Sequence, residues 1–229
     1  MTEHPNRANG KTLTGFERGV SLFELILGGA IVVGHNVFKI VPNEVPILAG
    51  LGLLSLFVRN GSLKPIGLTW PQSWTRTLVW AIATATLVQL NSEFVTDPLT
   101  KLIWHRPPNI SEFNSLKGNL SDAAALLVLS WSFAAFGEEF GYRGYLLARA
   151  ADIGGRSPVA YSLGLIVVSV LFGFGHYYQG PSGVLGTALD GFLIGAAYLL
   201  SGRNLWVAIL AHGLTDTFGV VVLFLGLAD

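Results

Sequence analysis

Blocks of consecutive apolar residues constrain the fold of this chain more than any other feature. The block 20–40 is long enough for a helix to cross a hydrocarbon core of about 30 Å, which takes about 20 residues. Further blocks follow at 46–58, 78–95, 121–136 (which can continue helically to about Ala150), 159–175, 184–200 and 205–227. Their turns are apolar all round, whereas a surface helix of a soluble protein carries a narrower apolar stripe. We therefore predict an all-α fold, a polytopic transmembrane helical bundle of about seven helices (six to eight).

The composition agrees with a membrane protein and excludes several other classes. Hydrophobic residues make up 51% of the 229 residues and charged residues only 12%, against roughly 25% charged in a typical soluble domain. A chain this apolar does not remain intrinsically disordered. Its 14 Lys and Arg are balanced by 14 Asp and Glu, so it lacks the basic excess of a nucleic-acid-binding protein. Because it has no cysteine, disulfides, thiolate zinc sites and a cysteine nucleophile are excluded.

The connectors between the apolar blocks predict how the chain lies in the membrane. Basic residues fall on alternate connectors, so the positive-inside rule places the N-terminus in the cytoplasm and the C-terminus outside. We divide this predicted multi-pass protein into a polar N-terminal tail (1–18), N-terminal transmembrane helices (19–95), an interfacial connector (96–120) and a catalytic transmembrane core (121–229). The basic residues used for this orientation are Lys11, Arg18, Arg59, Lys64, Arg76, Arg149, Arg156 and Arg203.

Ionisable residues lie inside the C-terminal apolar blocks, where each charge costs at least about 2.5 kcal/mol unless it faces a cavity or a partner. Glu139 and Arg143 are four residues apart and share a helix face, which predicts an ion pair. Glu138 points about 100° away from Glu139 and has no local cation. A carboxylate in that position favours a role as a proton acceptor.

Two further elements each contain a histidine. His176 ends the sequence Phe-Gly-Phe-Gly-His, and such a residue taken alone is more often hydrogen-bonded than catalytic. His212 and Asp216 are four residues apart, so Asp216 either fixes the tautomer of His212 or lines a reaction cavity with it. Asp190 lies outside these elements and partners either His176, Arg143 or a neighbouring helix. Together the elements form an acid–base cluster with water as the natural nucleophile. The sequence has no serine-nucleophile elbow, no His-Glu-x-x-His zinc helix and no phosphate-binding loop, so it does not indicate those classes of enzyme.

In this order the three elements resemble the CAAX protease and bacteriocin-processing family, which contains the type II CAAX prenyl endopeptidases, or Ras-converting enzymes. The resemblance covers about residues 120–227 and implies an intramembrane endopeptidase with a water-accessible site between its helices. Its partners would be the lipid bilayer and a peptide or membrane-protein substrate. The matching pattern is Glu138-Glu139-x-x-x-Arg143, then Phe172-x-x-x-His176, then His212-x-x-x-Asp216.

The resemblance also implies a role for each residue of the pattern. Glu138 would be the base that activates water, and His176 would orient that water. Glu139 and Arg143 would support these two residues. The remaining pair, His212 and Asp216, would stabilise the oxyanion of the tetrahedral intermediate.

Asp216 departs from the family pattern, in which asparagine is frequent at this position. An amide can donate a hydrogen bond to an oxyanion, whereas an ionised carboxylate only accepts. Three interpretations stay open: Asp216 is protonated, it orients His212, or the site binds a cation. For a divalent metal such as zinc, the candidate ligands are Glu138, His176, His212 and Asp216.

Two other functions are compatible with the same residues. A non-catalytic immunity or adaptor protein would bind a peptide in the same cavity. A proton-coupled transporter would also use buried acids and histidines, but the chain lacks the inverted repeat typical of that class. Substrate identity, prenylation of the substrate and oligomeric state do not follow from the sequence.

Overall fold

Capping residues precede the apolar blocks and determine where the helices begin. The computed structural model describes residues 13–227. At the start of α1 (Gly15–Asn36), Thr14 Oγ1 accepts a hydrogen bond from the Glu17 amide at 3.2 Å, and the Glu17 carboxylate accepts one from the Thr14 amide at 2.8 Å. Asparagine or serine side chains cap most of the other long helices, at Asn43, Ser73, Asn119, Ser157 and Asn204, whereas α8 (Gly180–Leu200) has no side-chain cap.

The described part of the chain is helical and contains no strand, which confirms the predicted all-α class. After α1 come α2 (Glu44–Asn60), η1 (Lys64–Ile66), α3 (Trp74–Asn91), η2 (Ser92–Thr96), α4 (Asp97–Trp104), η3 (Ser111–Leu116), α5 (Leu120–Leu129), η4 (Ser130–Glu138), η5 (Phe140–Leu146), α6 (Leu147–Ile153), α7 (Pro158–Gly175), η6 (Tyr177–Gln179), α8 (Gly180–Leu200) and α9 (Leu205–Leu225). Of these, η1, η3 and η6 are 3₁₀ turns, and η2, η4 and η5 are π-helical.

Five helical segments within residues 13–227 are long and apolar enough to cross a membrane. They agree with the predicted apolar blocks from residue 78 onward. α1 and α2 are helical, as predicted, but fall outside this set, and α2 has 17 residues where a span needs about 20. A membrane-spanning role for α1 therefore stays a prediction. The five segments are Trp74–Trp104, Leu120–Ile153, Pro158–Gly175, Tyr177–Leu200 and Leu205–Leu225.

The third predicted block is longer than its apolar residues indicated. The π-helical η2 joins α3 to α4, so the helix continues to Trp104. The first nine residues of the predicted connector 96–120 are thus helical, and its irregular part starts at His105. The prolines of this connector predicted an earlier end, but Pro98 closely follows the π-helical turn η2, and such an adjustment can accommodate a proline inside a membrane helix.

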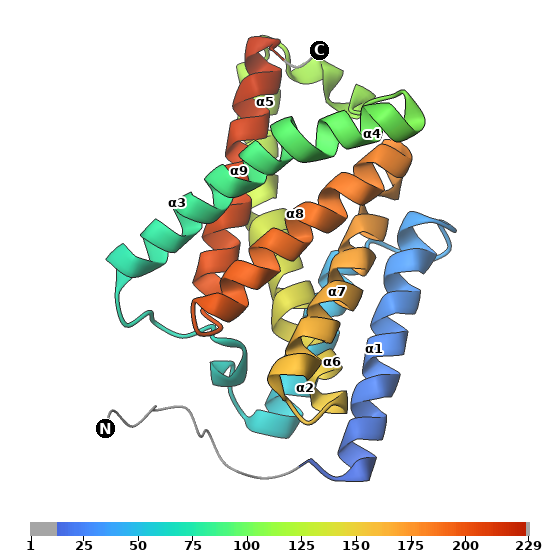
Figure 1. The fold of residues 1–229 in the computed structure, drawn as a ribbon, viewed down its shortest axis with the longest axis vertical. Coiled ribbons are helices and arrows are strands. Elements are labelled where there is room, and N and C mark those ends of the chain that lie inside the picture. Colours follow the sequence, from blue (N-terminus) through green and yellow to red (C-terminus); the bar gives the residue numbers. More distant parts are fainter. Residues whose placement is uncertain (1–12, 228–229) are drawn as a thin grey trace.

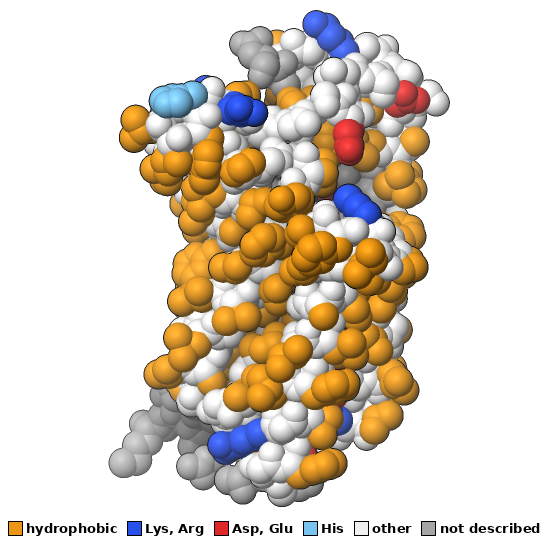
Figure 2. Space-filling view, turned by 90° about the vertical axis from the view of Figure 1, so that its right-hand side faces the viewer, with side chains coloured by type: hydrophobic (Ala, Val, Ile, Leu, Met, Phe, Trp, Pro, Cys, Tyr) orange, Lys and Arg blue, Asp and Glu red, His pale blue; other side chains and the backbone are white. Residues whose placement is uncertain are grey.

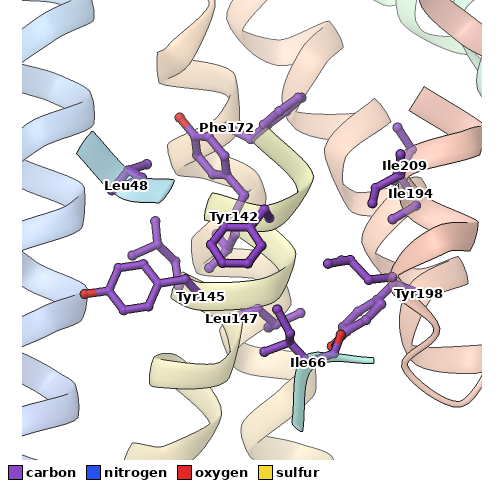
Figure 3. Close-up of a cluster of buried hydrophobic side chains, with 14 of the residues drawn as sticks. Leu48, Ile66, Tyr142, Tyr145, Leu147, Phe172, Ile194, Tyr198 and Ile209 are labelled. Carbon is purple, nitrogen blue, oxygen red and sulfur yellow. The ribbon is translucent and has the colours of Figure 1, made fainter. Parts of the chain in front are cut away.

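The helices pack around a core that the C-terminal elements dominate. α8 packs on α7, α3 crosses α9, and α1 packs on α6 and α7 (Figure 1). The core joins side chains from both halves of the chain: Leu48 of α2 lies on one side, Ile194 and Ile209 lie on the other, and Tyr142 and Phe172 lie between them (Figure 3). The segment that contains the acidic motif Glu138-Glu139-x-x-x-Arg143 therefore runs through the middle of the bundle.

On the face that Figure 2 shows, hydrophobic side chains cover the middle, and the charged side chains in view lie mainly toward the two ends. Large apolar side chains are exposed on several helices, among them Phe23 at 64%, Leu54 at 64% and Ile166 at 51%. Large contiguous apolar surfaces are rare on soluble monomers, whereas a bilayer core covers them. The surface thus agrees with the apolar helices in indicating a membrane environment.

A cluster of buried ion pairs collects the basic residues at one end of the bundle. The Asp152 carboxylate lies 3.1 Å from Arg149, 2.5 Å from Arg156 and 3.8 Å from Arg59. Arg59 also pairs with Glu24 of α1 at 2.5 Å. Basic residues from two of the predicted cytoplasmic connectors thus lie at the same end of the bundle, in agreement with the charge pattern. That this end faces the cytoplasm stays a prediction.

Candidate active site

The Glu139 carboxylate lies at the centre of the candidate site and is fully buried. Its Oε1 accepts a hydrogen bond from Arg143 Nη1 at 2.8 Å, which confirms the predicted ion pair. The same oxygen lies 2.8 Å from Nδ1 of His212, 73 residues away in the sequence. Because a carboxylate paired with arginine only accepts hydrogen bonds, Nδ1 of His212 carries the proton. Glu139 thus joins the first motif to the third.

Arg143 is held by three groups from different elements. Besides the Glu139 bond, its Nη2 donates to the backbone carbonyl of Gly191 in α8 at 2.8 Å. Its guanidinium lies over the ring of Phe172, 4.3 Å from the ring centroid. Arginine suits this position because its planar fork can reach two acceptors at once while it stacks on an aromatic ring.

Gly191 provides the space that Arg143 occupies, which leads to a prediction. A Cβ at Gly191 would lie 2.8 Å from Phe172 Cδ1 and 2.9 Å from Arg143 Nη2. We expect Gly191→Ala to lower the free energy of unfolding by about 1–3 kcal/mol, since side chains around a packed site must shift. Thermal unfolding in detergent measures this change. Gly219→Ala in α9 is the matched control, because a Cβ there meets no atom within 4 Å and alanine favours a helix by about 0.5–1 kcal/mol. Equal stability of the two variants would contradict the packing argument.

Phe172 connects the second motif to the other two. Its ring centroid lies 5.1 Å from that of His176, 5.9 Å from that of His212 and 5.1 Å from that of Tyr142. His176 follows the last residue of α7, and its Nδ1 lies 3.1 Å from the Phe172 carbonyl oxygen. A carbonyl only accepts, so Nδ1 donates and Nε2 of the neutral ring is left as an acceptor. His176 is therefore able to accept a hydrogen bond from water.

Glu138 differs from Glu139 in having no ion-pair partner among residues 13–227, although each of the two has a buried Oε2 without a hydrogen-bond donor. Its Oε2 is buried and receives no hydrogen bond from residues 13–227. The charges of His212 and Asp216 act on its carboxylate, which places it near the third motif. An acceptor oxygen without a donor in a buried site is the arrangement that a general base requires.

Asp216 lies at the other side of the His212 ring. Its Oδ1 is 3.6 Å from Nε2 of His212, beyond hydrogen-bond distance, and its carboxylate interacts with the hydroxyl of Ser130. His212 thus stands between two carboxylates, Glu139 at Nδ1 and Asp216 at Nε2. The motif spacing predicted the Asp216 neighbour, and only the fold reveals the closer Glu139 contact.

Two further buried acids, Asp190 and Glu44, have surroundings that only the structure shows. Asp190 interacts with the side chain of Asn91 in α3, which agrees with the neighbouring-helix alternative. Glu44 was not among the residues that the sequence singled out, yet it is 6% exposed and its charge acts on Glu138 and His176. Its position in the first turn of a helix gave no signal, since acids are common there for electrostatic reasons.

The residues proposed as metal ligands do not form a metal site as folded. Within residues 13–227, no three His, Cys, Asp or Glu side chains are arranged to hold a metal ion. In both histidines Nδ1 is the engaged nitrogen, bound to Glu139 or to the Phe172 carbonyl, and Nε2 is the nitrogen left to face a ligand. The arrangement of these side chains as folded does not support a metalloprotease site. The candidates were Glu138, His176, His212 and Asp216.

Comparison with known families gives a match over the segment that holds all three motifs. Residues 120–218 match the family model described as type II CAAX prenyl endopeptidase Rce1-like. No curated protein and no solved structure matches the chain. The apolar helices support an integral membrane protein, and its segment 120–218 is similar to a protease family. The resemblance drawn from the motifs is thereby confirmed: over residues 120–218 the chain is similar to the type II CAAX prenyl endopeptidases of the Rce1-like family.

Proposed function

We propose that this protein is an intramembrane endopeptidase that hydrolyses a membrane-associated peptide or protein with a water activated by Glu138. The observation that carries the proposal is the buried Oε2 of Glu138, which no described residue engages. Glu139 Oε2 also lacks a donor, but the Glu139 carboxylate is paired with Arg143 and His212 through its Oε1. Glu138 has no such ion pair among residues 13–227, so we assign to it the role of proton acceptor.

The proposed reaction uses each motif once. Nε2 of His176 accepts a hydrogen bond from the water. The water oxygen attacks the peptide carbonyl carbon while Glu138 Oε2 takes one of the water's protons. The carbonyl oxygen becomes an oxyanion. Glu138 then gives the proton to the amide nitrogen, the C–N bond breaks, and a carboxylic acid and an amine leave. Glu139 and Arg143 keep this geometry by holding His212 in place.

His212 stabilises the oxyanion only in its imidazolium form. Its Nδ1 proton is committed to Glu139, so Nε2 donates only when the ring carries a second proton. Glu139 and Asp216 place negative charge at both sides of the ring and thereby support an imidazolium. A charged donor aimed at a developing oxyanion stabilises a transition state more than it stabilises a substrate.

This assignment predicts that Asp216 acts through His212. We expect Asp216→Asn to retain cleavage within about tenfold of the wild-type rate, which corresponds to about 1.4 kcal/mol, because Glu139 still holds the ring and the new amide can itself donate. Cleavage kinetics of the purified variant measure the effect. Near-total loss of cleavage by a variant that unfolds at the wild-type temperature would contradict this role.

The proposed function is tested by comparing membrane proteomes of cells that carry the wild type or Glu138→Ala. We expect peptides or fragments that depend on the wild-type enzyme and disappear in the variant, and their ends give the cleavage site. Equal proteomes, with both proteins present at equal levels, would favour a non-catalytic immunity or adaptor protein.

A further inference from the structure

Glu44 is a buried acid outside the segment that matches the Rce1-like family, and two residues of α1 fix its position. It is the first residue of α2 and is 6% exposed. Asn36 Nδ2 donates to its Oε1 at 3.0 Å, and Nε2 of His35 lies 3.4 Å from its Oε2. Asn36 also donates to the Val32 carbonyl at 3.1 Å, so its amide is held from both sides.

The contacts of His35 place its ring against Glu44. Nδ1 of His35 is 3.0 Å from the Val41 carbonyl oxygen, and a carbonyl only accepts, so Nδ1 carries a hydrogen. The other ring nitrogen, Nε2, faces Glu44 Oε2. The Asn36 hydrogen bond and the burial together make Glu44 a fixed group and not a mobile surface acid.

Glu44 reaches the candidate site at the end of α7. A Cβ at Gly175 would lie 3.1 Å from the Tyr142 hydroxyl oxygen and 3.8 Å from Glu44 Oε1, so both oxygens border the residue that precedes His176. The charge of Glu44 acts on His176, on Glu138 and on the Tyr142 hydroxyl. The N-terminal helices thus add a carboxylate between the first and second motifs.

We propose that Glu44 is a positioning residue of the active site, which acts on the attacking water through His176. The inference rests on the proposed function. When Nε2 of His176 holds the water during attack, its ring gains positive charge, and the fixed Glu44 carboxylate stabilises that charge. The stabilisation is larger in the transition state than in the substrate complex, so it changes kcat more than KM.

The test uses the full-length protein in lipid nanodiscs and a fluorogenic peptide that spans the cleavage site mapped by the proteome comparison. Glu44→Gln removes the charge and keeps an oxygen that accepts from Asn36. We expect kcat to fall about tenfold, because the variant loses one electrostatic stabiliser that does not touch the substrate. KM should stay within about twofold of the wild-type value, and the unfolding temperature should not change. Asn36→Ser, which frees the carboxylate without removing it, is expected to lower kcat in the same direction by less.

Glu24→Gln is the matched control, because Glu24 is the other acid that α1 and α2 hold in an ion pair, with Arg59. We expect it to lower the unfolding temperature and to leave kcat of the folded protein unchanged. A wild-type kcat in Glu44→Gln overturns the role of Glu44, provided that the wild type cleaves and Glu138→Ala does not. If Glu44→Gln unfolds, a wild-type kcat in Asn36→Ser overturns it instead. An inactive wild type, or an active Glu138→Ala, overturns the proposed function itself.

Discussion

Glu138→Gln is expected to lower kcat for peptide cleavage by about 10²–10⁴-fold, the range that a positioned general base contributes. Glutamine has the shape of glutamate, but its amide has no basic oxygen that could take a proton from water. Because no described residue donates to Glu138 Oε2, the substitution breaks no hydrogen bond at that atom. Folding should therefore be unaffected or slightly favoured, since an uncharged amide is easier to bury. Cleavage kinetics and thermal unfolding of the same preparation measure both effects.

Asp190→Asn supplies the matched control for the neutralisation of a buried acid. Asp190 also has a buried oxygen, Oδ1, without a hydrogen-bond partner among residues 13–227, but it interacts with Asn91 and lies outside the three motifs. We expect its kcat to stay within about twofold of the wild type, since surface and structural acids do not enter the transition state. Similar losses in the two variants would point to a general electrostatic effect and against Glu138 as the base.

The fold was largely predictable because a membrane leaves a long chain few choices. Apolar blocks of spanning length must form helices, since backbone groups in lipid can find hydrogen-bond partners only within a helix or a closed barrel. The π-helical elements η4 and η5 were not predictable. A one-residue shift in hydrogen bonding leaves no trace in apolar periodicity, although such segments often occur at functional sites.

The site was predictable where contacts are local and not where they depend on packing. A spacing of four residues on a helix predicted the Glu139–Arg143 pair and placed Asp216 beside His212. The bond from His212 to Glu139 spans 73 residues of sequence, and no helical periodicity encodes it. Glu44 was missed for the same reason, because its burial results from the packing of the N-terminal helices against the C-terminal core.

Arg143→Met is expected to cause the largest loss of stability among these variants, about 3–5 kcal/mol, which is typical when one partner of a buried ion pair is removed. Glu139 would stay buried with His212 as its only hydrogen-bond donor among residues 13–227, and the Gly191 carbonyl would lose the side-chain bond that holds α8 to the motif. Thermal or denaturant unfolding in detergent measures the loss. Lys101→Met, which removes an exposed cation of α4, is the control and should change the free energy of unfolding by less than about 0.5 kcal/mol.

The double variant Arg143→Met with Glu139→Gln separates the cost of an unpaired charge from the value of the pair. If the single variant is unstable because Glu139 is left without its cation, neutralising Glu139 should restore about half or more of the lost free energy of unfolding. Cleavage should not recover, because His212 then lacks the negative partner that holds its Nδ1 proton. Wild-type stability of Arg143→Met alone would contradict the structural role of the pair. Stability recovered without cleavage would mean that this core folds with uncharged methionine and glutamine in place of the ion pair. The charged Glu139–Arg143 pair would then be required to orient and charge His212.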